Sequence, residues 1–111
     1  MKAWRIENDD GIDALNLAEI DIGEPGPGEV RFRVKASSLN RRDYNTVRAP
    51  GERNTPMPRI PNSDAAGEVV SVGECVSEFK PGDRVASCFF KRWQGGRMRA
   101  PIMASALGGA E

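Results

Sequence analysis

Residues 29–39 carry the clearest alternation of apolar and polar side chains in this sequence. Val30, Phe32 and Val34 alternate with Arg31 and Arg33. A period of two is typical of a β-strand, because successive side chains point to opposite faces. We therefore expect one buried face and one face that carries its cations into water. We interpret those cations as a solvated surface rather than a binding patch.

Weaker versions of this pattern predict further strands. Residues 2–7 alternate loosely, and residues 14–22 fit a second strand, although their leucines and alanines also permit a short helix. In residues 60–85, small residues lead into an apolar run that ends at Gly73, followed by a turn at residues 80–83 and more extended chain. Glycine and proline at these offsets favour strand, turn, strand.

Helical spacing is clearest between two of these strands. Leu39, Asp43 and Val47 fall on one helical stripe. Asn40 is placed to cap a short helix over residues 40–47 by accepting backbone N–H bonds. The sequence therefore predicts one short helix in a chain of strands.

The remaining segments carry weaker signals. Glycines and prolines make residues 49–61 a long loop, and such loops are usually functional or mobile. Aromatic side chains in residues 89–93 either line a pocket or an interface or belong to the core, which is the role we favour for Phe89. A weak helix, started by a proline, is expected over residues 100–107.

These elements predict a mainly β domain with one short helix, built as a small barrel or sandwich. A length of 111 residues suits one domain with one core. Because the chain stops without completing an element, we expect this domain to be incomplete at its C-terminus.

Charge and rare residues exclude several classes of function. Lys plus Arg and Asp plus Glu number 16 each, so the formal net charge is zero, which argues against a nucleic-acid binder and a polybasic membrane patch. There is no histidine, which excludes imidazole metal ligands and histidine acid/base catalysis within these residues. Two cysteines, no signal peptide and no membrane-length apolar run predict a cytoplasmic protein.

Polar residues gather at the start of the expected helix, in residues 40–44, and just before the central strand, in residues 62–64. Asp43 and Asp64 are candidate functional carboxylates, and Arg41 and Arg42 could hold an anionic oxygen through their planar donors. Each also has a simpler explanation. Asp43 suits the first turn of a helix, the arginines suit a surface, and Asp64 could bond local backbone.

Several well-known motifs are missing from the sequence. It contains no glycine-rich dinucleotide fingerprint, no phosphate-binding loop, no Cys-x-x-Cys pair and no serine or cysteine triad. The chain therefore holds no dinucleotide-binding domain of its own.

The order of its short motifs nevertheless resembles one family. The chain is similar to the N-terminal, GroES-like catalytic domain of the medium-chain dehydrogenase/reductase superfamily, which contains zinc-type alcohol dehydrogenases and zinc-free quinone oxidoreductases. The match covers nearly the whole chain. Its motifs are Met1-Lys2-Ala3, Pro25-Gly26-Pro27-Gly28-Glu29-Val30, Ala36-Ser37-Ser38-Leu39-Asn40-x-Arg42-Asp43, Ile60-Pro61-x-Ser63-Asp64-x-Ala66-Gly67-Glu68-Val69-Val70-x-Val72-Gly73 and Phe79-Lys80-x-Gly82-Asp83-Arg84-Val85.

The resemblance implies a GroES-like, partly open β-barrel with one short helix over residues 1–111. It also implies that the chain is truncated before a Rossmann domain that binds NADP or NAD. The substrate, a quinone, an enone or another small carbonyl compound, would lie in the cleft between the two domains. The resemblance further suggests a homodimeric full-length protein, and we expect the fragment alone to be inactive.

Departures from the zinc enzymes bear on the chemistry that the resemblance implies. Those enzymes place a zinc-binding cysteine where this chain has Asn40, and their Gly-His-Glu triplet corresponds here to residues 62–64, Asn-Ser-Asp. Without thiolate and imidazole, no tetrahedral catalytic zinc is expected there. The resemblance thus implies zinc-independent reduction that relies on positioning and on hydrogen-bond donors at the developing oxyanion.

The resemblance also assigns roles to the candidate residues. It implies that Asn40 and Asp43 are catalytic and orient cofactor and substrate. Arg41 matches the place where many zinc enzymes hold a cation near the cofactor pyrophosphate, and Arg42 belongs to the Asn-x-Arg-Asp variant of this lineage. Tyr44 and Asp64 would form part of the substrate pocket, and no residue is assigned to a metal.

Two other classes of function fit less well. A GroES-like binding module without catalysis, such as a co-chaperonin, carries an apolar contact tripeptide in its mobile loop, whereas residues 53–58 read Arg-Asn-Thr-Pro-Met-Pro. An oligonucleotide-binding barrel would stack bases on aromatic side chains in basic surroundings. The zero net charge disfavours that alternative.

Overall fold

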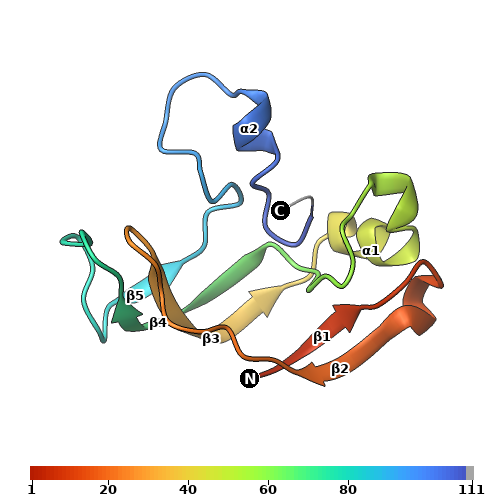
Figure 1. The fold of residues 1–111 in the computed structure, drawn as a ribbon, viewed down its shortest axis with the longest axis horizontal. Coiled ribbons are helices and arrows are strands. Elements are labelled where there is room, and N and C mark those ends of the chain that lie inside the picture. The colour runs from red at the N-terminus through yellow and green to blue at the C-terminus, as the bar shows by residue number, and fades with distance from the viewer. Residues whose placement is uncertain (110–111) are drawn as a thin grey trace.

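The computed structural model describes residues 1–109 and contains two separate antiparallel sheets (Figure 1). The first is a hairpin of β1 (Lys2–Ile6) and β2 (Leu15–Glu19), and the second has the order β3-β4-β5. The other elements are β3 (Val30–Ser38), β4 (Asp64–Val72), β5 (Arg84–Ala86), the helices α1 (Arg41–Arg48) and α2 (Ala100–Met103), and the 3-10 helices η1 (Gly11–Ala14) and η2 (Gly51–Arg53).

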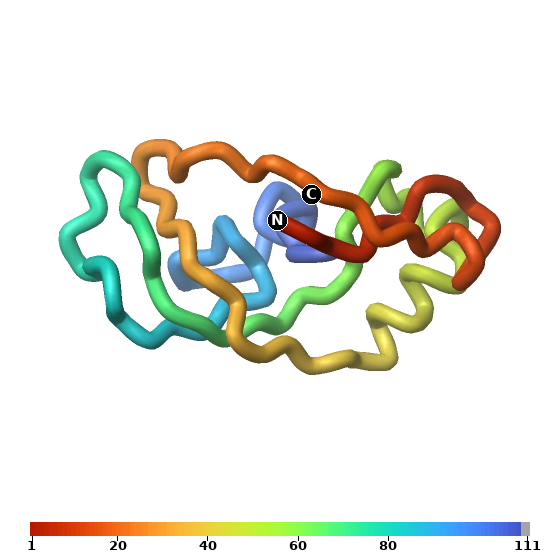
Figure 2. The backbone as a smooth tube through the Cα atoms, turned by 90° about the horizontal axis from the view of Figure 1, so that it is seen from below, coloured from red at the N-terminus to blue at the C-terminus, as the bar shows by residue number. Residues whose placement is uncertain are grey.

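The molecule is flattened, with extents of 42 × 35 × 21 Å. Figure 2 shows the long turn between β4 and β5 at one end, and the β1–β2 hairpin with α1 at the other. One isolated bridge, Ile6 to Arg59, joins the hairpin to the chain that leads into β4. The two sheets do not close into a barrel. The prediction of a mainly β, partly open fold with one short helix is therefore confirmed.

The strand-turn-strand prediction for residues 60–85 is also confirmed by β4 and β5. At the turn, the Asp83 carboxylate accepts hydrogen bonds from the backbone N–H (2.9 Å) and the Nζ (3.0 Å) of Lys80. Gly82 adopts a φ of +93°, which favours glycine. Within β4, a Cβ on Gly67 would overlap the backbone carbonyl of Arg33, so only glycine lets β3 and β4 approach this closely.

The expectation of a buried apolar face on β3 is wrong. Val34 is 54% exposed, and from Arg33 onward every residue of the strand is exposed. The register between β3 and β4 also shifts twice, between Arg31 and Phe32 and between Val34 and Ala36. A period of two shows that one face of a strand is apolar, but it does not show which element covers that face. Here, Phe32 and Val34 face a pocket.

The core of the described chain is small. Its buried apolar side chains are distributed over both sheets, η1, α1 and the C-terminal segment, and are Ile6, Ala14, Val47, Val69 and Ala106. Near the C-terminus, α2 is a single turn, shorter than the helix expected over residues 100–107. The chain then forms turns and a bridge from Phe90 to Ala106. Among residues 1–109, no helix is long and apolar enough to cross a membrane.

Candidate functional site

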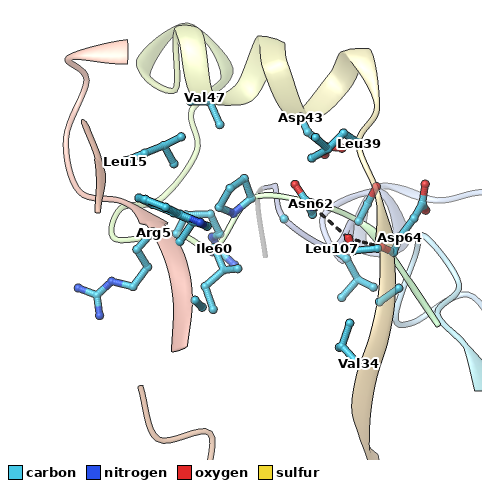
Figure 3. Close-up of a pocket in the computed structure, with 18 of the residues that line it drawn as sticks. Arg5, Leu15, Val34, Leu39, Asp43, Val47, Ile60, Asn62, Asp64 and Leu107 are labelled. Carbon is cyan, nitrogen blue, oxygen red and sulfur yellow. Dashed lines mark hydrogen bonds between the residues drawn. The ribbon is translucent and has the colours of Figure 1, made fainter. Parts of the chain in front are cut away.

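A pocket of about 1050 Å³ lies between the β1 side of the molecule, β3 with α1, and the chain that leads into β4 (Figure 3). Several apolar side chains that are exposed to solvent line it, which explains why β3 leaves its apolar face open. These side chains are Trp4, Ile12, Val34, Leu39, Tyr44 and Ile60. The pocket therefore suits a ligand with a substantial apolar surface.

One side of this pocket carries a group of hydrogen-bonded polar side chains, which we call the polar corner: Ser37, Asn40, Asn62 and Asp64. The Asn40 amide donates to the Asp64 carboxylate. Asn62 Nδ2 donates to Ser37 Oγ (3.1 Å), and Ser37 Oγ donates to the Asp64 carbonyl (2.8 Å). Figure 3 shows Asn62 and Asp64 on the same side of the pocket. The polar corner thus joins the end of β3 to the start of β4.

Asp43 lies beside the polar corner but serves the helix. The residue is 4% exposed, and its Oδ2 accepts the backbone N–H of Asn40 at 2.8 Å. This bond satisfies a donor at the start of α1, where the helix leaves N–H groups without partners. Its Oδ1 has no hydrogen-bond partner among the described residues and lies 3.7 Å from Arg42 Nη1. One carboxylate oxygen of Asp43 therefore holds the start of the helix, and the other accepts no hydrogen bond from the described residues.

The two arginines occupy different surroundings. Arg41 is exposed at the start of α1 and does not line the pocket. Arg42 Nη1 donates to the Leu107 carbonyl at 3.0 Å, and the guanidinium lies 4.7 Å from the centre of the Phe89 ring. A Cβ on Gly109 would overlap Arg42 Nη2. Arg42 thus ties α1 to the C-terminal segment, while Arg41 is free of such contacts.

The pocket brings together four of the six residues that the sequence suggested. Asn40, Asp43, Tyr44 and Asp64 line it, although they come from α1 or its cap and from β4. The arginines at positions 41 and 42 are not lining residues. The sequence reasoning placed the polar residues correctly at element ends but could not tell which of them face the same space.

Four further serine and asparagine residues line the pocket, and none of them was given a role from the sequence: Ser37, Asn62, Ser63 and Ser87. Ser37 and Asn62 belong to the polar corner, and the side chain of Ser63, with 4% exposure, lines the pocket beside them. Asn62 has a φ of +78°, a conformation that asparagine tolerates better than most residues. The sequence placed Asn62 and Ser63 in the polar cluster before the central strand, and Ser37 in a family motif, but it gave no sign of their partners. Their hydrogen bonds link positions too distant for local patterns to reveal.

Two carboxylates outside this pocket have shifted pKa values. The Lys91 ammonium and the Gly26 N–H bond to Glu29 and lower the pKa of its carboxyl. The backbone N–H of Lys80, and then its side chain, lower the pKa of Asp83. Both shifts follow from hydrogen bonds to the charged form of an exposed carboxylate.

No group of three or more His, Cys, Asp or Glu side chains is arranged to hold a metal within residues 1–109. Cys75 and Cys88 are both free and exposed, and neither lines the pocket. The groups at the polar corner that could bind a metal ion are amides, hydroxyls and the Asp64 carboxylate. This set lacks the thiolate and imidazole ligands of typical catalytic zinc sites.

Residues 26–109 match the family described as the alcohol dehydrogenase GroES-like domain. The chain belongs to this family. The predicted resemblance to the medium-chain dehydrogenase/reductase superfamily is thereby confirmed. The domain is homologous to domains of oxidoreductases.

Relatives and solved structures agree with this membership. A zinc-type alcohol dehydrogenase-like protein of Schizosaccharomyces pombe is 37% identical over 89% of this chain and 29% of its own length. The crystal structure of a putative alcohol dehydrogenase from Sinorhizobium meliloti has a TM-score of 0.82 at 36% identity, covering 98% of this chain and 33% of that one. The Escherichia coli quinone oxidoreductase complexed with NADPH has a TM-score of 0.71 at 28% identity, covering 78% and 26%. The chain therefore spans a third or less of the length of these proteins.

Proposed function

We propose that residues 1–111 form the substrate-side, N-terminal domain of a zinc-independent, NAD(P)H-dependent oxidoreductase that reduces a quinone, an enone or another carbonyl compound. The observation that carries this proposal is the hydrogen bond between the Asn40 amide and the Asp64 carboxylate at the wall of an apolar pocket. Family membership supports the class of reaction, and the E. coli relative named above, which is described in complex with NADPH, supports the class of cofactor.

The side chains available as metal ligands support a reaction without zinc. A tetrahedral catalytic zinc needs three protein ligands, usually thiolate or imidazole with or without a carboxylate. Asp64 is bonded to the Asn40 amide, and Asp43 is bonded to the start of α1. An amide that holds the carboxylate as a hydrogen-bond acceptor leaves no place for a cation between them. The residues present thus fit a hydrogen-bonded site better than a metal site.

Bound NAD(P)H would supply the hydride, and this chain would supply the surroundings of the acceptor. The apolar wall that includes Trp4 and Val34 would exclude water from the acceptor and so strengthen polar interactions near it. Asn40, Asp43 and Tyr44 would orient the substrate from α1 and its cap, with Asp64 fixing the Asn40 amide.

Of the two arginines, Arg41 is the better candidate for contact with the cofactor pyrophosphate, since its guanidinium is exposed. Arg42 would act indirectly, because its contacts with Phe89 and Leu107 hold the helix that carries Arg41. Two free, exposed cysteines suit a reducing compartment, so we place the protein in the cytoplasm and expect a homodimer of the full-length chain.

The test is a steady-state assay of the full-length protein that contains this chain. NADH and NADPH oxidation are measured with a quinone, an enone and a saturated ketone, before and after treatment with EDTA. We expect turnover with at least one acceptor, and no loss after chelation. Activity that EDTA removes and zinc restores would contradict the zinc-free proposal, and the absence of turnover with every acceptor would contradict the reductase proposal. The isolated 111-residue chain should not oxidise NADPH above the blank.

A further inference from the structure

The Ser63 hydroxyl is one of four buried polar atoms on pocket-lining residues that have no hydrogen-bond partner among the described residues; the others are Arg5 Nε, Asp43 Oδ1 and Arg59 Nε. Among these four atoms, the Ser63 Oγ is the only uncharged donor. The residue is 4% exposed and lines the pocket, and its Oγ has no hydrogen-bond partner among the described residues. Buried hydroxyls in folded proteins nearly always have a partner, because an unpaired one forfeits its hydrogen bonds to water. This exception requires an explanation in terms of what enters the pocket.

Neighbouring serines show that the local backbone does not lack partners. Ser37 Oγ donates to the Asp64 carbonyl at 2.8 Å, and Ser87 Oγ donates to the Ser63 carbonyl at 3.0 Å. Ser87 Oγ also accepts the Ala65 N–H at 3.0 Å. Ser87 therefore holds the main chain from Ser63 to Ala65, while the hydroxyl of Ser63 itself is left unused.

The position of Ser63 places this hydroxyl next to the polar corner. Asn62 and Asp64, its chain neighbours, both bond to Ser37. The Asp64 carboxylate already receives the Asn40 amide. The Asn40 and Asn62 amides have each committed one N–H to a protein acceptor, whereas the single O–H of Ser63 has no acceptor, so a ligand oxygen in the pocket could accept it. Asp43 Oδ1, which also lacks a hydrogen-bond partner, is an acceptor and would not serve a carbonyl oxygen.

We propose that Ser63 donates the hydrogen bond that holds the carbonyl oxygen of the substrate in this pocket. The inference rests on the proposed reductase function and adds a residue to it. As hydride from the nicotinamide reaches the carbonyl carbon, negative charge develops on the oxygen. A donor held beside that oxygen stabilises the charge more than it stabilises the neutral ketone. Ser63 thus takes part of the role that a Lewis acid has in a metal enzyme.

The test compares Ser63→Ala with Ser71→Ala in the full-length protein. Ser71 is a matched control, because its hydroxyl bonds Glu24 at 3.3 Å and does not line the pocket. Cyclohexanone and methylenecyclohexane, which lacks the oxygen, are titrated by ligand-observed NMR with NADP⁺ bound. The wild type and Ser71→Ala should prefer the ketone by about 5–10-fold, the value of one hydrogen bond, and Ser63→Ala should lose this preference. An unchanged preference in Ser63→Ala, or none in the wild type, would overturn the inference.

Two further measurements separate this role from a structural one. The melting temperature of Ser63→Ala should equal or exceed that of the wild type, because the hydroxyl gives up no protein partner. A clear fall in melting temperature would show that the hydroxyl is bonded within the protein and would overturn the inference. With an accepted carbonyl substrate, kcat/KM should fall about 100-fold in Ser63→Ala at unchanged KM for the cofactor. If no acceptor is turned over even by the wild type, the reductase proposal fails, whereas the NMR preference still decides the role of Ser63.

Discussion

Asp64 is the first residue of β4, and Asp83 directly precedes β5 in the same sheet. Both carboxylates accept hydrogen bonds, but their structural roles differ. Both bonds to the Asp83 carboxylate come from Lys80, three residues away, and they close an exposed turn. The Asp64 carboxylate receives Asn40, 24 residues away, and Ser38, 26 residues away at 3.4 Å. A local bond shapes one turn, whereas a non-local bond joins two elements and thereby builds a pocket wall.

The same contrast separates two glycines with positive φ. Gly82, in the Asp83 turn, has nothing within 4 Å of the place where a Cβ would be. Gly108, beside the polar corner, has a φ of +66°, and a Cβ there would overlap the backbone of Asn62. At the turn, glycine is needed for its backbone conformation alone. At the pocket, it is needed for that conformation and for the close approach of two segments.

The largest effect should come from testing this pair of glycines in the full-length protein. Gly82→Ala should lower the free energy of unfolding by about 1 kcal/mol, the cost of a side chain in the left-handed region. Gly108→Ala should cost about 2–3 kcal/mol more, because the Asn62 backbone must also move. Denaturant unfolding measures both variants. Equal losses would show that the Gly108–Asn62 approach is not a constraint on the pocket.

A second, smaller effect concerns the two adjacent arginines of α1. Arg42→Met removes the bond to the Leu107 carbonyl and the contact with Phe89, and it leaves the buried Asp43 without a nearby cation. We expect a loss of about 2 kcal/mol in unfolding free energy. Arg41→Met, the matched control on the same helix, should change it by less than about 0.5 kcal/mol, since Arg41 is exposed. A similar loss in both variants would contradict the assignment of Arg42 as the tie between α1 and the C-terminal segment.

The polar corner itself can be tested by a double-mutant cycle. Asn40→Ala and Asp64→Ala, alone and together, should give a coupling free energy of about 1 kcal/mol, measured by denaturant unfolding. Lys80→Ala and Asp83→Ala form the comparison cycle, and their side-chain coupling should be smaller, because solvent screens an exposed pair. A coupling near zero for Asn40 and Asp64 would show that their bond does not hold the start of α1 to the start of β4 at the pocket.

The smallest effect is a titration at the exposed turn. NMR should give a pKa for Asp83 below its ordinary value. Lys80→Ala should raise this pKa only part of the way back, because the backbone N–H of residue 80 is the largest cause of the shift and remains. A complete return to the ordinary value would assign the shift to the ammonium instead.

The sign of the linked stability follows from the lowered pKa. The contribution of Asp83 is present above its unfolded pKa, and it is lost as the pH falls through the lower folded pKa. Asp83→Asn should therefore reduce the acid dependence of stability at and below the ordinary pKa of an aspartate. It should change the dependence little near neutrality. Parallel acid profiles for the variant and the wild type would contradict this.

Local features of the fold were accessible from the sequence because their causes lie within a few residues. The alternation at residues 29–39 predicted β3, the stripe from Leu39 to Val47 predicted α1, and the glycine and proline at residues 80–83 predicted the turn before β5. The length of α2 was overestimated, because a proline that starts a helix does not supply the apolar face needed to continue it.

The candidate residues were named from the sequence one by one, but not as an arrangement. Asn40, Asp43, Tyr44 and Asp64 were named because polar residues at element ends are candidates for function, and they do line one pocket. Ser63 was named within the polar cluster of residues 62–64 but was given no role, since only its burial without a partner distinguishes it. Arg42 gave no sign that its guanidinium would lie against Phe89, far along the chain.

The sequence alone determined the types of element, the turns and the kinship with the GroES-like domains of alcohol dehydrogenases, because each depends on residue type and local spacing. The tertiary structure decided which face of β3 is left open, which carboxylate serves a helix and which serves a pocket, and which serine keeps a free hydroxyl. These outcomes depend on contacts between segments tens of residues apart, such as Asn40 with Asp64 and Gly108 with Asn62. Local patterns hold no information on such pairs, since the packing of the whole chain brings them together.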